Sequence, residues 1–385
     1  MGLLRSAYLL ILPAALGIWG CGGIRLERPP ATGAVGWTQD GGGPPRRNSV
    51  PDTLTPPLRE LWVRNVGAGV GKGSPLAADG LVFAGNLRGE LHVLDAATGD
   101  RLGSQDFGES MEGSPALGGG VVFAGLSNTE RSLLAFDPAQ GRILWSRACG
   151  EIESAVLFYE GAVIAGTTSG EIVSVEAETG REKWRFAIPR NRARKGFRSS
   201  PAASRGIVAA GGEDGFIYGL DAATGMLRWT YEAGAPVSAS PCLEGGTLIA
   251  GDESGVLHAL SLEDGTHLWR HDTGDPIAAG ATSWGRAVIQ VTTAGRMMAL
   301  CAGDGRMLWM TDLGSPPGGP AVAAGGVLYA GTLGKELLAV DAESGRILWR
   351  HPLPGRMKTA PALSGGRLYV ATDERSVIAL EPVPR

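Results

Sequence analysis

One short motif recurs along this chain about every 40 residues, and that repeat constrains the fold more than any other feature of the sequence. The first gap between its tryptophans is two periods long, and Gly103 stands where a tryptophan is missing. Self-similarity at a fixed period of this length predicts an architecture in which each repeat is one supersecondary unit. The ladder comprises seven of the ten tryptophans, at spacings of 83, 39, 45, 40, 40 and 40 residues: Trp62, Trp145, Trp184, Trp229, Trp269, Trp309 and Trp349.

Each repeat has the pattern of short β-strands joined by tight turns. A turn that ends in glycine, such as Asp221–Gly225, precedes Gly103 and six of the tryptophans. Its first side chain can hydrogen-bond the backbone two residues on, and the glycine takes the left-handed position. Upstream lies a strand with apolar residues on both faces, which indicates a strand covered on both sides. A second pair of strands around a glycine-bearing turn makes four antiparallel strands in each repeat.

Four strands in a repeat of about 40 residues predict a propeller blade. The last repeat ends before its outer strand, whereas Leu58–Val63 copies that strand at the other end of the chain. We therefore expect an all-β, eight-bladed β-propeller of four-stranded antiparallel blades, closed by the N-terminal strand around Trp62 without an open edge. We also expect each of the seven tryptophans to pack between its own blade and a neighbouring blade. Eight blade-start motifs supply the count: Ser74-Pro75, Ser114-Pro115, Ser154-Ala155, Ser200-Pro201, Ser240-Pro241, Ala279-Gly280, Gly319-Pro320 and Ala360-Pro361.

The N-terminus has the pattern of an export signal followed by an anchor. The apolar run Ala7–Ile18 follows Arg5 and has twelve residues, fewer than the ~20 that span a bilayer as a helix. The following residues, Ile18 to Cys21, resemble a lipoprotein signal, in which the cysteine is acylated and becomes the mature N-terminus. No aspartate follows Cys21, so the same resemblance favours the outer membrane. An ordinary secretory signal with an incidental cysteine is the alternative.

These observations divide the chain into three parts. Residues 1–20 are predicted to be a lipoprotein signal peptide, and residues 58–385 a single propeller of the repeat described above. Residues 21–57 are rich in glycine and proline, centre on Gly41–Pro45 and have no sustained periodicity. This composition predicts a tether that lets the folded part stand off the membrane.

Charge and cysteine content exclude several classes of function. The formal net charge is −4, with 35 basic and 39 acidic residues, which gives no general electrostatic reason to bind nucleic acid. Beyond Cys21 the cysteines are Cys149, Cys242 and Cys301, an odd number without a Cys-x-x-Cys pair. The pattern fits neither a disulfide framework nor a zinc site.

The repeat resembles a known family. The segment Gly219–Trp229, Gly-Leu-Asp-Ala-Ala-Thr-Gly-Met-Leu-Arg-Trp, is similar to the PQQ-type (quinoprotein) propeller repeat, and the resemblance extends over residues 58–381. Within that group, an exported lipoprotein with eight blades and nothing else is similar to the BamB family, and Leu61–Gly71 looks like the opening of its propeller. The resemblance implies a lipid-anchored, non-enzymatic scaffold for protein–protein interaction in outer-membrane β-barrel assembly. Its implied partner is an assembly complex.

The same repeat also occurs in enzymes, so two alternatives stay open. Quinoprotein dehydrogenases resemble this chain in their ring and hold PQQ over calcium. In this chain nearly every repeat is minimal and no Cys-Cys pair occurs. His92 and His258 are interpreted as packing residues, and no nucleophile, acid and base set is found. We expect no catalytic residue, metal or cofactor, and interpret the acidic pairs as solvated turns: Glu213-Asp214, Asp252-Glu253 and Asp373-Glu374. A PQQ-binding protein or quinoprotein-type oxidoreductase is one alternative, and a sensor or binding propeller unrelated to assembly is the other.

One connection departs from the repeat. Between Trp184 and Ser200 the chain is about six residues longer than elsewhere, and the insertion is basic. We hypothesise that this basic loop (residues 189–198) docks an acidic periplasmic partner, or anionic headgroups, through charge steering. A solvated loop is the alternative. The loop carries five cations: Arg190, Arg192, Arg194, Lys195 and Arg198.

Overall fold

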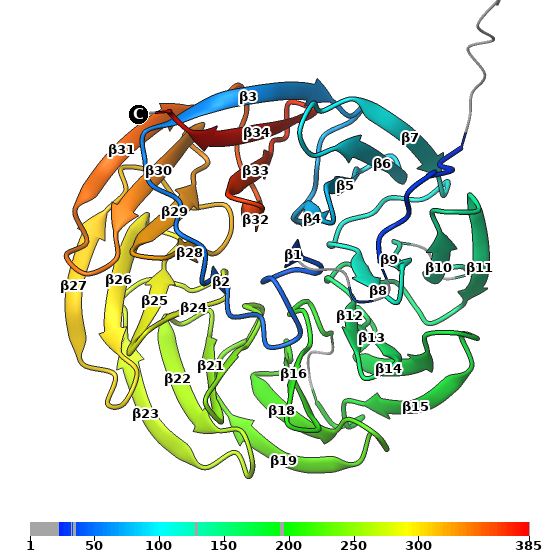
Figure 1. The fold of residues 1–385 in the computed structure, drawn as a ribbon. Helices are drawn as coiled ribbons and strands as arrows, with labels where there is room; N and C mark the ends of the chain where they lie inside the picture. Colours follow the sequence, from blue (N-terminus) through cyan, green and yellow to red (C-terminus); the bar gives the residue numbers. More distant parts are fainter. Residues whose placement is uncertain (1–22, 32, 34–35, 128–129, 193–195, 385) are drawn as a thin grey trace, which may run out of the picture.

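The computed structural model describes residues 23–31, 33, 36–127, 130–192 and 196–384. Eight four-stranded antiparallel sheets stand around a central channel (Figure 1), which confirms the predicted all-β, eight-bladed propeller. In the part of the chain that the structure describes, no helix is long and apolar enough to cross a membrane. Residues 1–20 and Cys21, predicted as signal peptide and acylation site, lie outside the described residues.

The blades follow one another along the chain, and the strands of each blade are named in order from the channel outwards. Blades 1 to 4 comprise β4 (Leu76–Ala78), β5 (Leu81–Gly85), β6 (Glu90–Asp95) and β7 (Arg101–Asp106); β8 (Ala116–Gly118), β9 (Val121–Gly125), β10 (Leu133–Asp137) and β11 (Arg142–Arg147); β12 (Leu157–Tyr159), β13 (Ala162–Gly166), β14 (Glu171–Glu176) and β15 (Glu182–Ala187); β16 (Ala202–Ser204), β17 (Ile207–Gly211), β18 (Phe216–Asp221) and β19 (Leu227–Glu232). Blades 5 to 8 comprise β20 (Cys242–Glu244), β21 (Thr247–Gly251), β22 (Val256–Ser261) and β23 (His267–Asp272); β24 (Thr282–Trp284), β25 (Ala287–Val291), β26 (Arg296–Cys301) and β27 (Met307–Asp312); β28 (Val322–Ala324), β29 (Val327–Gly331), β30 (Glu336–Asp341) and β31 (Ile347–Pro352); β32 (Ala362–Ser364), β33 (Arg367–Ala371), β34 (Ser376–Pro382) and β3 (Leu58–Asn65).

The blade tryptophans lie in the seams between blades. Trp62 donates its indole N–H to Ala96 O in the next blade at 3.2 Å. A Cβ on Gly99 in the same turn would lie 2.5 Å from the Trp62 ring, and the φ of Gly99 is +72°, so only glycine fits. Five more indoles make the equivalent bond: Trp145 to Ala177, Trp184 to Ala222, Trp229 to Leu262, Trp269 to Ala302 and Trp309 to Ala342. Trp349 is instead only partly buried and stacks on His351 with 5.2 Å between ring centroids.

The ring closes between the two ends of the propeller. β3 pairs antiparallel with β34, from Leu58 opposite Pro382 to Asn65 opposite Ser376, and both strands lie side by side in Figure 1. Closure by the strand around Trp62 is therefore confirmed. This pairing gives the outer side of β34 a hydrogen-bonding partner that the last repeat lacks in its own sequence.

The prediction of a free tether over residues 21–57 is wrong for residues 36–54, which fill the central channel; we call this segment the channel plug. β1 (Gly36–Trp37) pairs antiparallel with β4, and β2 (Ser49–Val50) pairs parallel with β28. Between them the plug accepts hydrogen bonds from the middle residue of successive inner strands: Leu117 N to Thr38 O, Phe158 N to Gln39 Oε1, Ala203 N to Pro44 O, Leu243 N to Pro45 O, Ser283 N to Arg47 O and Ala323 N to Asn48 O.

Residues 36–54 enter the channel because the inner edge of each sheet needs hydrogen-bond acceptors. Each innermost strand presents backbone N–H groups to the channel, and buried donors need acceptors. Glycine and proline in the plug provide the bends that follow a ring of acceptor positions, as at Gly41 and Gly42 with φ of +72° and +86°. The glycine and proline content of the plug therefore reflects its winding course through the channel. The fully buried Trp37 fixes the start of that course.

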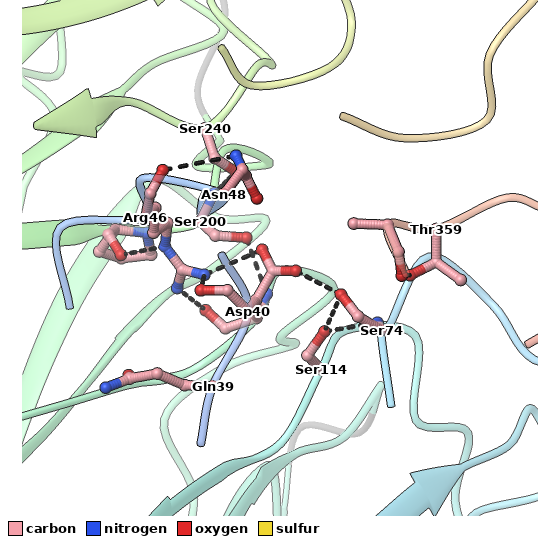
Figure 2. A network of polar contacts seen from close by, with 12 residues as sticks. Gln39, Asp40, Arg46, Asn48, Ser74, Ser114, Ser200, Ser240 and Thr359 are labelled. Atoms are coloured by element: carbon pink, nitrogen blue, oxygen red, sulfur yellow. Dashed lines mark hydrogen bonds and ion pairs between the residues drawn. The ribbon is translucent and has the colours of Figure 1, made fainter. Parts of the chain in front are cut away.

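Arg46 holds the turn of the plug in the channel (Figure 2). Its side chain is 2% exposed, and it donates from Nε to Pro201 O at 2.7 Å and from Nη2 to Ala155 O at 3.3 Å. Nη1 contacts Asp40 Oδ2 at 2.9 Å. Burial lowers the pKa of Arg46, and the Asp40 carboxylate opposes that shift. The guanidinium thus ties blades 3 and 4 to the plug through carbonyl oxygens.

Removing one seam tryptophan tests the closure of the ring. We expect Trp62→Ala to lower the free energy of unfolding by about 3–5 kcal/mol, the usual cost of truncating a buried aromatic side chain. Trp349→Ala is the matched control and should cost clearly less, because that ring is only partly buried. Urea unfolding monitored by far-UV circular dichroism measures both values. Equal losses would contradict the role of Trp62 in closure.

A neighbouring pair of arginines tests the channel plug. Arg46→Ala leaves Asp40 without its buried cation, and breaking such a pair costs about 3–5 kcal/mol. Arg47→Ala is the control, because the Arg47 side chain is 48% exposed and pairs with Glu244 at the surface, a contact worth about 1 kcal/mol or less. We expect Arg46→Ala also to make the plug sensitive to limited proteolysis. A plug that stays resistant in a protein of unchanged stability would refute this role.

Candidate functional site: a funnel above the channel plug and the basic loop

A cavity of about 700 Å³ lies at one end of the channel. Asp40, Arg46 and Asn48 of the plug line it, together with the connections that lead from the outer strand of one blade to the inner strand of the next. These connections meet at the same end of the channel because every blade has the same four-stranded path. We call this cavity the funnel. Charged side chains of the plug and of several blades contribute to its lining.

The blade-start serines form hydrogen bonds around the throat of the funnel. Ser74 N donates to Ser114 Oγ at 2.7 Å, and Ser200 N donates to Ser240 Oγ at 3.0 Å (Figure 2). Ser74 Oγ donates to Asp40 Oδ1 at 2.6 Å, which connects this ring of bonds to the plug. The serines that count the blades in the sequence therefore join neighbouring blades, and their hydroxyls are engaged in structural bonds.

The rim of the funnel carries charges of both signs. Arg356 and Lys358 both approach Asp373, at 2.7 and 3.7 Å. Lys72 and Glu253 line the cavity as well. Such a rim can bind polar or charged groups of another protein, because it offers cations and carboxylates next to each other.

The structure separates the predicted cations of the basic loop into different roles. Arg190 is exposed. The guanidinium of Arg192 lies 3.6 Å from the ring centre of Phe216 and 3.7 Å from Asp214. Arg198 lines the funnel and pairs with Glu213 at 2.7 Å and with Glu153. Arg194 and Lys195 lie outside the described residues.

The loop is fixed to the propeller by an aromatic cluster. Phe197 is fully buried and meets Tyr218 edge to face, with 5.7 Å between ring centroids. Phe186 and Phe216 contact the same tyrosine ring. The basic loop is thus held at its base by apolar packing. Phe197, which stands among the cations in the sequence, is the residue that signals this contact.

In two of the acidic pairs predicted as solvated turns the aspartate is buried, which corrects that interpretation for Asp214 and Asp252, whereas Glu253 is exposed. Asp214 accepts a hydrogen bond from Tyr218 Oη at 2.5 Å, and its side chain is buried. Asp252 is fully buried and contacts His258 Nε2 at 2.9 Å. Both aspartates lie in the turn before the third strand of their blade, and a polar side chain of that strand, Tyr218 or His258, reaches back to them. His258 therefore has a polar role beyond packing.

These contacts shift the pKa of Asp252 and the pKa of Tyr218. Burial alone would raise the pKa of Asp252, but hydrogen bonds from His258, Ser254 and the Val256 N–H outweigh it and lower that pKa. Burial and the Asp214 carboxylate raise the pKa of the Tyr218 phenol. Each aspartate is thus committed to a local partner in its own blade.

Sequence reasoning missed the residues that form the floor of the funnel. Asp40, Arg46 and Asn48 lie in a segment without periodicity, which carries no signal for a strand or helix. Trp37 was the available clue, because a large aromatic residue in a Gly/Pro-rich segment points to a buried contact.

Solved structures with the same architecture include BamB from Moraxella catarrhalis, with a TM-score of 0.71 and 21% identity over 85% of this chain and 98% of that chain. A quinohemoprotein alcohol dehydrogenase from Comamonas testosteroni has a TM-score of 0.75 and 16% identity over 91% of this chain and 81% of that chain. At these identities the likeness shows the fold alone.

Similar proteins also carry both descriptions. An outer membrane protein assembly factor BamB from Burkholderia pseudomallei is 29% identical over 138 residues, or 35% of this chain and 35% of that protein. The Comamonas testosteroni quinohemoprotein alcohol dehydrogenase is 27% identical over 141 residues, or 30% of this chain and 20% of that protein. The matched segments thus span only a minor part of the length of these relatives.

The funnel residues do not fit the calcium-bound quinone that the dehydrogenase relatives imply. Hard cations need several oxygen ligands at one point, but Asp40 is paired with Arg46, and Glu153 is paired with Arg198. Across the described ranges, no group of three His, Cys, Asp or Glu side chains could hold a metal ion. Five of the seven blade tryptophans are buried in the seams between blades, and none of the seven lines the funnel.

A family model agrees with the repeat over most of the chain. It matches in three overlapping segments, residues 26–198, 190–319 and 294–383. Together these segments begin before the channel plug and end one residue beyond β34, so they include every blade. The chain therefore belongs to the family described as outer membrane protein assembly factor BamB.

Proposed function

We propose that this protein is a lipid-anchored, non-enzymatic propeller that serves as a protein–protein interaction scaffold in outer-membrane β-barrel assembly. The observation that carries the proposal is the family match over residues 26–383. Acylation of Cys21 at the outer membrane, with the propeller facing the periplasm, is part of the proposal and is supported by the signal-like sequence before it. The partner we propose is an outer-membrane β-barrel assembly complex.

The site supports a binding role better than a catalytic one. In the funnel, Ser74 and Asp40 are hydrogen-bonded to each other, and Glu153 is paired with Arg198. A reaction needs a nucleophile and base that converge on an open position. The quinoprotein-type oxidoreductase stays the second candidate, because the dehydrogenase from Comamonas testosteroni is among the similar proteins. Retention of PQQ absorbance after desalting in the presence of calcium would favour it.

We propose the basic loop as a docking element for an acidic partner surface. Phe197 and the Arg192–Phe216 contact hold the described parts of the loop, Arg198 lines the funnel, and Arg190 is exposed. Because Arg192 and Phe197 are held on the propeller before binding, ordering these two residues adds little cost when a partner docks. Charge complementarity then accelerates the encounter of the two surfaces.

A triple variant tests this docking role. Arg190→Ser, Arg194→Ser and Lys195→Ser together remove three cations and leave Arg192 and Arg198, which hold the loop. We expect weaker co-purification of the β-barrel insertase from detergent-solubilised membranes. The difference from the wild type should shrink between about 0.1 M and 1 M salt, because screening shortens the reach of charge from about 10 Å to about 3 Å.

The matched control removes the same charge elsewhere. Arg270→Ser, Arg286→Ser and Arg306→Ser affect three exposed arginines on blades 5 and 6. We expect this control to keep wild-type capture at each salt concentration. Equal capture by both triple variants would remove the basic loop from the proposal, and no insertase with the wild-type protein would contradict the proposed function itself.

A further inference from the structure

The seam between blades 1 and 2 lacks the tryptophan that other seams contain. Gly103 of β7 stands at that position, opposite Val93 of the third strand. Ile24 fills the place instead: it is fully buried, and a Cβ on Gly103 would lie 2.9 Å from the Ile24 Cα. A main-chain segment from before the propeller therefore occupies the site of a blade side chain.

The same segment also replaces the hydrogen bond of the missing indole. Leu26 N donates to Pro138 O at 2.8 Å. Pro138 is the second residue of its turn. Ala177 has the same position in the turn of blade 3, where its carbonyl oxygen accepts the hydrogen bond from Trp145. The Ile24 carbonyl oxygen lies against Gly141, the turn glycine that elsewhere faces an indole. Residues 24–26, which we call the strap, thus form the seam contact of blade 1.

The strap leaves almost no free chain between the propeller and the proposed acylation site. Cys21 precedes Ile24 by three residues, and three residues span at most about 11 Å even when fully extended. A tether of the length predicted from composition would let the propeller turn freely on its anchor. With a buried Ile24, the rim beside the strap has to stay within that short distance of the lipid surface.

The rim at this point has side chains suited to a bilayer surface. Leu102 of β7 and Ile143 and Leu144 of β11 are exposed apolar residues. Two exposed arginines accompany them: Arg142 directly precedes Ile143, and Arg25 belongs to the strap. Apolar side chains next to arginines match the boundary between anionic headgroups and acyl chains. Figure 1 shows the first described residues, in dark blue, running inward from the rim beside β7.

We propose that these five residues, which we name the anchor rim, rest on the lipid bilayer and fix the orientation of the propeller. This inference depends on acylation of Cys21, which belongs to the proposed function. Because the contact is made by the outer edge of blades 1 and 2, the funnel on the ring axis stays open to a protein partner. The anchor and the interaction surface are thus separated by the rigid ring.

Fluorescence quenching by brominated lipids tests the anchor rim in the full-length, acylated protein reconstituted into phosphatidylethanolamine/phosphatidylglycerol vesicles. A fluorescent probe attached to Leu144→Cys reports on the anchor rim, and the same probe on Leu308→Cys is the matched control. Both residues directly precede a blade tryptophan and have similar exposure, 38% and 47%. Cys301→Ser removes a partly exposed thiol, whereas burial raises the pKa of Cys149 to about 11 and that of Cys242 to about 12, which keeps both unreactive.

We expect the probe at position 144 to lose most of its emission in brominated vesicles and the probe at position 308 to keep it. Equal quenching at both positions in vesicle-bound protein would overturn the anchor rim. Failure of the protein to sediment with vesicles, unchanged by Cys21→Ser, would instead refute the anchor itself and the inference with it.

A second variant separates the strap from the anchor. Ile24→Gly removes the side chain that fills the seam, so the strap should detach and lengthen the free chain. We expect vesicle binding to persist while the difference between the two probes is lost. A preserved difference would show that the strap does not set the orientation, which contradicts the proposal.

Discussion

The structure depends on one repeated contact, the docking of an indole on the turn of the next blade. The turn glycine allows the ring to approach, as Gly99 does for Trp62, and the indole N–H donates to a carbonyl oxygen of the same turn. Six of the eight seams contain this indole bond. Because each blade contacts only its neighbours, the ring has to close on itself. The chain closes it twice at its N-terminal side, through β3 at blade 8 and through the strap at blade 1.

The second constraint is the channel that a ring of eight blades leaves on its axis. Inner strands cannot pair across it, so their N–H groups need acceptors from elsewhere. The channel plug supplies backbone carbonyls to successive blades, and Arg46 donates to carbonyls of two of them. What remains of the channel is a funnel with engaged polar groups. The funnel is the surface that we propose for recognition of a partner.

The repeat, the blade count and the closing strand could be predicted because they rest on periodic patterns. Column positions that alternate between small and large apolar residues specify a blade wherever they occur. The plug and the strap could not be predicted this way. Gln39, Asp40 and Arg46 contact distant blades through individual side chains that follow no periodic pattern. Gly103 indicates a missing tryptophan, but it does not tell which residue replaces that side chain. Burial of Asp214 and Asp252 likewise depends on side chains that reach back from the third strand.

The function that we propose for this propeller is assistance in the assembly of outer-membrane β-barrel proteins. The most direct measurement is the amount of folded barrel protein, detected by heat-modifiable electrophoretic mobility, in outer membranes of cells that lack this protein. The account predicts less folded barrel protein and its recovery when the wild-type chain is restored. Unchanged amounts of folded barrel protein in cells without it would contradict the account.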